Sequence, residues 1–146
     1  MEYKNMMPEH VEQVAQLEKL CFSCPWSEKA VSGELSNPLS LWIVAVEGEQ
    51  VIGYVGSQSV MGEADMMNIA VAPEFRRQGV AETLVEKLIS LLKFSDVYCL
   101  TLEVRDSNVP AIALYEKMGF VQVGRRPNYY TAPKEDALIL RKEWQL

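Results

Sequence analysis

Arg76-Arg77-Gln78-Gly79-Val80-Ala81 is the stretch that says most about the fold of this 146-residue chain. It follows a strand-like run and opens the strongest predicted helix, residues 79–94. Backbone N–H groups at a helix N-terminus lack intrahelical acceptors, and the helix dipole is positive there, so the stretch suits an anion. Gly79 and Ala81 are small enough for a pyrophosphate to approach the backbone. Spacing alone leaves a plain glycine loop with solvated arginines equally favoured, and the strand-loop-helix context tips the interpretation toward phosphate.

Hydrophobic periodicity outward from this stretch predicts alternating helices and strands. The helices are expected at residues 8–20, 27–35, 79–94 and 108–118, and the strands at 41–46, 51–60, 64–71, 97–104, 120–123 and 137–141. Ser27 and Asn108 are expected as helix caps, and a loop rich in Pro and Tyr is expected between the last two strands. The predicted buried stripes are Val11, Val14, Leu17 and Leu20 in the first helix, and Val80, Leu84, Leu88 and Leu91 in the third. This order implies a mixed α/β sheet with helices on both faces.

Composition narrows the class of protein. The chain is 49% hydrophobic and 23% charged, which is typical of a globular protein. Its longest apolar run, Leu41 to Val46, falls far short of the roughly 20 residues that span a bilayer. No signal peptide or repeat is visible, so we expect one cytoplasmic domain over residues 1–146, without membrane contact. The net charge of −6 argues against nucleic-acid binding and suits a basic partner.

The cysteines give little support for a redox or metal site. Cys21 and Cys24 form a CxxC pair, Cys99 is remote, and His10 is the only histidine. A zinc site needs a second ligand pair, and a thioredoxin-like site needs the motif at the end of a strand. Neither context is present, so we interpret the pair as coincidental and expect no metal.

Two residues on neighbouring predicted elements could form an acid–base pair. Taken alone, Glu103 on the polar face of a strand is more often solvated, and Tyr115 on a helix is more often core. Asn108 and Tyr115, however, are seven residues apart on one helical face, and the strand of Glu103 feeds directly into that helix. The carboxylate and the phenol can therefore converge at one end of the strand, where α/β ligand sites lie.

The motifs also resemble a known family. Arg76-x-x-Gly79-x-Ala81 is similar to the (Q/R)-x-x-G-x-(G/A) acyl-CoA signature of the GNAT superfamily of N-acetyltransferases. From about Phe22 onward, further segments resemble one subfamily, the RimI-type ribosomal-protein-alanine N-acetyltransferases. They are Pro25–Ser27, Asn68–Val71, Leu102–Arg105, Ser107–Asn108, Ala111–Glu116, Gly119–Phe120, Asn128–Tyr130 and Glu135–Ala137.

The resemblance implies a GNAT fold, with a mixed sheet of about six to seven strands flanked by about four helices, and acetyl-CoA as co-substrate. It implies that main-chain groups of Ile69, Ala70 and Val71 pair with the pantetheine arm, and that the pyrophosphate is held by the amides of Arg77, Gln78, Gly79, Val80, Ala81 and Glu82. Asn108 would contact the cofactor through its side chain. Glu103 would be the general base, and Tyr115 the general acid that protonates the leaving thiolate.

Three positions bear on how far the resemblance extends. Ala81 ends the signature where glycine is the alternative, which the pattern allows. The carboxylate of Glu82 lies near the expected phosphates, so its side chain is assigned no binding role. Pro127 stands where a basic residue is more usual, which bears on peptide preference.

The function implied is acetylation of the N-terminal alanine of a small-subunit ribosomal protein by a monomer or weak dimer. Two alternatives stay open at this point. One is acetylation of a small amine such as a polyamine or a drug. The other is a CoA-binding partner module without turnover, against which the presence of both Glu103 and Tyr115 speaks.

Overall fold

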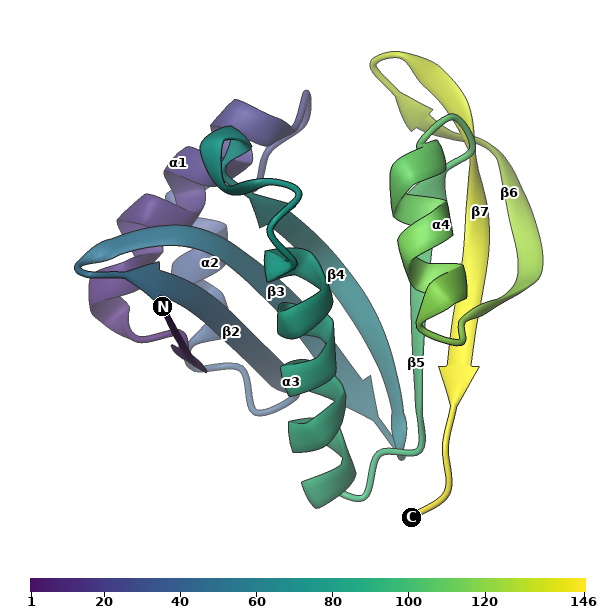
Figure 1. The fold of residues 1–146 in the computed structure, drawn as a ribbon, viewed down its shortest axis with the longest axis horizontal. Helices are drawn as coiled ribbons and strands as arrows, with labels where there is room; N and C mark the ends of the chain where they lie inside the picture. The colour runs from purple at the N-terminus through teal and green to yellow at the C-terminus, as the bar shows by residue number, and fades with distance from the viewer.

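A computed structural model describes all residues, 1–146, as a seven-stranded sheet with helices on both faces (Figure 1). The strands are β1 (Glu2–Asn5), β2 (Ser40–Glu47), β3 (Gln50–Val60), β4 (Glu63–Val71), β5 (Cys99–Arg105), β6 (Val121–Thr131) and β7 (Lys134–Glu143). The α-helices are α1 (Val11–Cys21), α2 (Glu28–Glu34), α3 (Val80–Phe94) and α4 (Val109–Lys117), and the 3₁₀ helices are η1 (Pro8–His10) and η2 (Pro73–Phe75). This confirms the mixed α/β sheet with four flanking helices.

The sheet splits between strands β4 and β5. In the order β1-β2-β3-β4-β5-β7-β6, only the β4–β5 pair is parallel. It covers just three residues, Glu63–Asp65 opposite Cys99–Thr101. β4 then continues along β3 to Val71, with Met67 left unpaired in a bulge. Beyond Asp65 the β5-facing edge of β4 therefore has no strand partner, and Figure 1 shows the two strands diverging toward the N-terminal end of α3.

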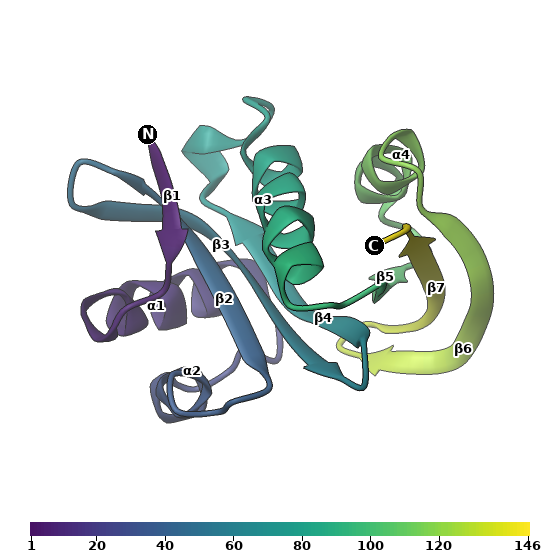
Figure 2. The same ribbon diagram turned by 90° about the horizontal axis from the view of Figure 1, so that it is seen from below.

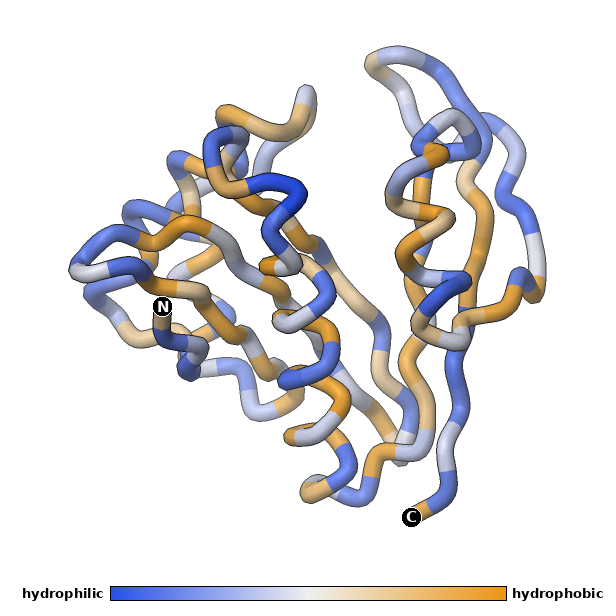
Figure 3. Tube along the Cα trace, in the orientation of Figure 1, coloured by the Kyte–Doolittle hydropathy of each residue, from blue (hydrophilic) through white to orange (hydrophobic).

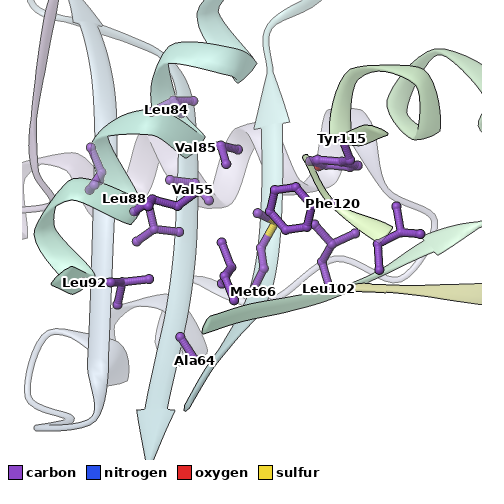
Figure 4. Packing of buried hydrophobic residues seen from close by; sticks show 14 of the residues in the cluster. Val55, Ala64, Met66, Leu84, Val85, Leu88, Leu92, Leu102, Tyr115 and Phe120 are labelled. Carbon is purple, nitrogen blue, oxygen red and sulfur yellow. The ribbon is translucent and has the colours of Figure 1, made fainter. Parts of the chain in front are cut away.

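Two hydrophobic clusters hold the layers together. The larger one joins α3 and α4 to one face of the sheet; Figure 4 shows Leu84, Leu88 and Leu92 of α3 beside the sheet, and Tyr115 with Phe120 beside Leu102. The smaller cluster lies between α1, α2 and strands β2 to β4, and it contains no residue of β5, β6 or β7. Helices thus cover only the N-terminal half of this second face (Figure 2).

Two predicted helix faces were partly wrong. Leu20 and Leu91, expected in buried stripes, are 64% and 38% exposed. In α1, three steps of three residues rotate the position by half a turn, so Leu20 lies opposite Val11. In α3 the four-residue step from Leu88 leads to Leu92, which is 2% exposed. The buried face of each helix therefore follows the 3.6-residue helical period rather than repeated steps of three residues.

The chain ends also differ from the prediction. β1, unrecognised in the polar N-terminal sequence, pairs antiparallel with β2 as an edge strand. The expected Pro- and Tyr-rich loop is instead the continuation of β6 and the start of β7. Pro127 is tolerated there because the β6–β7 register breaks between Arg126 and Tyr130, where Asn128 adopts a left-handed φ of +54°.

Candidate active site

The loop before α3 presents a run of unpaired backbone amides. Arg77 and Gly79 adopt left-handed φ values of +62° and +78°, and Gly79 is the N-cap of α3. The first helical bond is that of Thr83 N–H to the Gly79 carbonyl, at 3.0 Å. The six preceding amides, those of Arg77 to Glu82, donate to no acceptor in the chain. Such consecutive N–H groups at a helix N-terminus form an anion site, and Figure 3 shows how hydrophilic this loop is.

This loop lines a pocket of about 370 Å³ between α3 and α4. Val71, Phe75 and Val80 supply apolar wall on the sheet side, and Pro110 and Leu114 supply it from α4. A larger pocket of about 490 Å³ lies at α1 and α2 and contains none of the predicted site residues. The pocket at α3 combines an anion site with an apolar wall, as a phosphorylated cofactor with an alkyl arm requires.

The free edge of β4 borders the same region. Ala72 N–H donates to Ile52 O of β3 at 2.8 Å. By antiparallel alternation Ala70 also faces β3, whereas Ile69 and Val71 face the open side. Ala70, predicted to contact the cofactor, therefore directs its main-chain groups into the sheet. The Ile69 N–H already donates to Asn68 Oδ1 at 3.2 Å, and the Val71 carbonyl accepts from Arg76 Nε. The Ile69 carbonyl and the Val71 amide remain the groups that could pair with an extended arm.

Arg76 occupies the first position of the signature and is exposed, but its guanidinium is bonded within the chain. Its Nε donates to the Val71 carbonyl at 3.0 Å, and its Nη2 lies 3.5 Å from the Sγ of Cys21. The side chain therefore ties the anion-binding loop to the end of β4 and to the end of α1. Cys21 and Cys24 are both free thiols.

The predicted cofactor residues of α3 and α4 show two roles. Asn108 is the N-cap of α4, as expected, because its Oδ1 accepts from Ala111 N–H at 3.3 Å. Its Nδ2 has no partner in the chain. The Glu82 carboxylate pairs with Lys117 at 3.3 Å, which links α3 to α4 and leaves the Glu82 backbone amide as its contribution to the anion site.

Glu103 lies on the sheet face that carries no helix beyond β4. Its neighbours in β5, Leu102 and Val104, are buried on the opposite face, which confirms the predicted alternation. The Glu103 carboxylate faces Arg126 of β6, with 3.4 Å between Oε1 and Nε. The carboxylate is 29% exposed, so it is open to a substrate from that side.

Tyr115 lies on the other side of the sheet, under α4. It is 4% exposed and packs edge-to-face on Phe120, with ring centroids 5.5 Å apart. Burial raises the pKa of Tyr115 to about 12, with a smaller contribution from Tyr130. Its hydroxyl makes no hydrogen bond in the chain. Ser40 Oγ is the only side-chain polar atom that is both inaccessible to solvent and without a hydrogen-bond partner, so the Tyr115 hydroxyl is not fully buried. The Tyr115 hydroxyl therefore reaches an opening while its ring is core.

Tyr130 lies close enough to both Tyr115 and Glu103 to interact with each of them electrostatically. Burial raises the pKa of Tyr130 to about 12, and the negative charge of Glu103 adds to the shift. The ring lies under the guanidinium of Arg105, 4.3 Å from its centroid. Glu135 accepts from Ser107 N–H at 2.6 Å, so the β6–β7 hairpin is attached to the loop that begins α4.

Sequence reasoning missed Glu18. This α1 carboxyl group is completely buried and accepts from Trp26 N–H at 2.8 Å, from Asn68 Nδ2 at 2.6 Å and from the Tyr54 hydroxyl. Trp26 belongs to the α1–α2 connection, and Asn68 follows the β4 bulge. Glu18 therefore joins the connection to the strand that borders the cofactor region. The signal was present, since Val11, Val14 and Glu18 are spaced i, i+3, i+7 on one helical face.

Glu18→Gln should change how stability depends on pH. Burial raises the pKa of Glu18, so the folded state binds this proton more tightly than the unfolded state does. Wild-type stability therefore falls as pH rises from the unfolded pKa, near ~4.3, through the raised folded value. The neutral glutamine lacks this loss, so the stability difference should shift in its favour as pH rises from the unfolded pKa through the raised folded pKa. Urea unfolding at several pH values measures this, with the exposed Glu12→Gln on the same helix as control. Parallel curves for wild type and Glu18→Gln would contradict the prediction.

Comparisons with known proteins agree with the fold and with the class of protein. The model of the acetyltransferase (GNAT) family matches residues 11–120, and the chain belongs to this family. A Salmonella typhimurium ribosomal protein bS18-alanine N-acetyltransferase is 41% identical over 128 residues, which is 86% of this chain and 85% of that protein. The crystal structure of the Escherichia coli ribosomal-protein-S18-alanine N-acetyltransferase superposes with a TM-score of 0.91 at 33% identity, covering 99% of this chain and 94% of that one.

A more distant structure shares the fold alone. Arabidopsis thaliana NAA60, solved in complex with acetyl-CoA, superposes with a TM-score of 0.87 at 19% identity, covering 97% of each chain. The predicted GNAT fold and the acetyltransferase class are thus confirmed. None of the helices is both long and apolar enough to cross a membrane.

Proposed function

We propose that this enzyme transfers the acetyl group of acetyl-CoA directly to the α-amine of an N-terminal alanine on a basic ribosomal protein. The observation that carries the cofactor assignment is the run of six unpaired amides at α3, next to the free edge of β4. The amides would hold the pyrophosphate, and Ile69 with Val71 would pair with the pantetheine arm. The thioester would then lie where β4 and β5 diverge, between the side of Glu103 and the side of Tyr115.

The acceptor assignment rests on the named relatives and on the amine chemistry. An α-amine with a pKa of ~7.8 is neutral in about one molecule in seven at pH 7. A sizeable fraction can therefore attack the thioester without first being deprotonated by a strong base. Glu103 lies on the open sheet face and would remove the proton as the new C–N bond forms, directly or through water. Collapse of the tetrahedral intermediate would break the C–S bond, and Tyr115 would give a proton to the leaving thiolate.

The reaction should favour an N-terminal amine over a lysine in the same peptide. At pH 7 the neutral fraction of a lysine is roughly 300-fold smaller, equivalent to about 3.5 kcal/mol. We expect a peptide beginning Ala-Arg, with an internal lysine, to gain one acetyl group on its α-amine. Mass spectrometry with fragmentation locates that group, and the N-terminally blocked peptide is the control.

The other outcomes separate the alternatives. Modification of the lysine, or of a polyamine in preference to the peptide, would place the enzyme among small-amine or lysine acetyltransferases. Cofactor binding without transfer to any amine would favour a CoA-binding module.

A further inference from the structure

The helix-free face of the C-terminal half of the sheet carries an unusual charge arrangement. Register places Glu103 opposite Ile139, and Ala137 opposite Arg126. Ala137, Ile139 and Arg141 are every second residue of β7, so their side chains point to one face of the sheet. Glu103 and Arg126, as their cross-strand neighbours, share that face with Arg141. This is the face from which an acceptor would approach Glu103.

Arg126 is the only side chain in the chain that pairs with Glu103. The Glu103 carboxylate has no hydrogen bond and no other ion pair. The adjacent Arg125, by contrast, is anchored twice, to Asp106 at 2.8 Å and to Asp136 at 3.1 Å. The Arg126 guanidinium also lies over the ring of Tyr129, 5.9 Å from the centroid, and its positive charge partly offsets the rise that burial causes in the pKa of Asp65.

The backbone at Arg126 favours exchange of this contact. Register between β6 and β7 is lost directly after Arg126 and returns at Tyr130. The side chain is 55% exposed, so it can leave Glu103 without unpacking the core. An ion pair of this exposure contributes little to stability, so another cation can replace Arg126 beside Glu103 at small cost in free energy.

We propose that Arg126 occupies the place of the acceptor ammonium at Glu103 and is displaced by it. The inference rests on the proposed function, because it assumes an amine acceptor at Glu103. About six in seven α-amines carry a positive charge at pH 7, so the acceptor arrives as a cation. One cation replaces another, and the Glu103 carboxylate is never left unpaired. A guanidinium keeps its proton, so Arg126 competes for the carboxylate without acting as an acid.

The exchange also explains how the cycle closes. The bound ammonium first loses one proton to solvent water, and the neutral amine then attacks the thioester and loses its second proton to Glu103 as the C–N bond forms. The product is a neutral amide, which has no charge to offer Glu103. Arg126 then returns to the carboxylate as the acetylated N-terminus leaves. Arg126 is thus a positioning residue that favours acceptors arriving with a positive charge.

Binding of an Ala-Arg peptide to the CoA-saturated enzyme tests this without turnover. Removing the competitor in Arg126→Gln should tighten peptide binding about two- to fivefold, the range expected for a partly exposed ion pair. Arg126→Lys keeps a cation beside Glu103 and should bind like wild type. Arg141→Gln removes the same charge from the same face, where Arg141 pairs with Glu63 and Glu143, and should leave the affinity unchanged.

A thermodynamic cycle separates the local exchange from a general charge effect. In a Glu103→Gln background, Arg126→Gln should no longer tighten binding, because the carboxylate over which the cations compete is gone. The same gain in that background, or weaker binding of Arg126→Gln in the wild-type background, would overturn the proposal. Wild type that neither binds nor acetylates the peptide would instead refute the proposed function, and the inference with it.

Discussion

Tyr115→Phe is expected to lower kcat about 10²-fold, while the Tm stays near that of wild type. The change removes one hydroxyl and keeps the ring that packs on Phe120. The phenol has no other task in the fold, because its hydroxyl bonds to nothing in the chain. A tyrosine is protonated at neutral pH, which is the state that a proton donor needs, and burial raises the pKa of Tyr115 further, to about 12.

Steady-state kinetics with acetyl-CoA and the Ala-Arg peptide measure this loss. Tyr98→Phe is the matched control, because Tyr98 lies just before β5, near the C-terminal end of α3 and away from the loop at its N-terminal end. A thioester whose leaving thiolate is a weaker base needs less protonation, so the defect of Tyr115→Phe should shrink with such a donor. Wild-type turnover in Tyr115→Phe would remove Tyr115 from the mechanism.

The geometry of the loop before α3 was largely predictable because its signals are local. The strand, the loop with Gly79 and the helix stripe follow one another in sequence, and the unpaired amides are a direct consequence of a helix N-terminus. The cap at Asn108 and the alternation around Glu103 are local in the same sense. Each of these features needs only a few consecutive residues, so the tertiary structure had little to add.

The acceptor side was predictable only in part, because its contacts are long-range. The role of Glu18 depends on its hydrogen bond with Asn68, which is 50 residues away in sequence. The pairing of Arg126 with Glu103 depends on β7 lying between β5 and β6 in the sheet, an order that hydrophobic patterns do not report. Pro127 argued for a loop, and only the register break shows how a strand accommodates it.

Glu103→Gln should lower kcat/KM for the peptide about 10²- to 10³-fold at pH 7 and leave acetyl-CoA binding unchanged. Glutamine matches glutamate in size but cannot accept the proton that the amine loses as the C–N bond forms. The residual rate then depends on amines that are already neutral in solution. It should rise nearly tenfold per pH unit below ~7.8 and level off above that value.

The pH dependence of kcat/KM for the variant and for wild type makes the test quantitative. Glu63→Gln, which removes a carboxylate from the same sheet face and pairs only with Arg141, is the control. A loss of less than about threefold in Glu103→Gln would mean that water takes the proton without help from Glu103. A loss that is much larger at pH 6 than at pH 9, beyond the change in the neutral fraction of the amine, would give the carboxylate a second task, that of holding the ammonium before it reacts. That task is the one for which Arg126 competes, so in such a case Arg126→Gln should affect the KM for the peptide more than kcat.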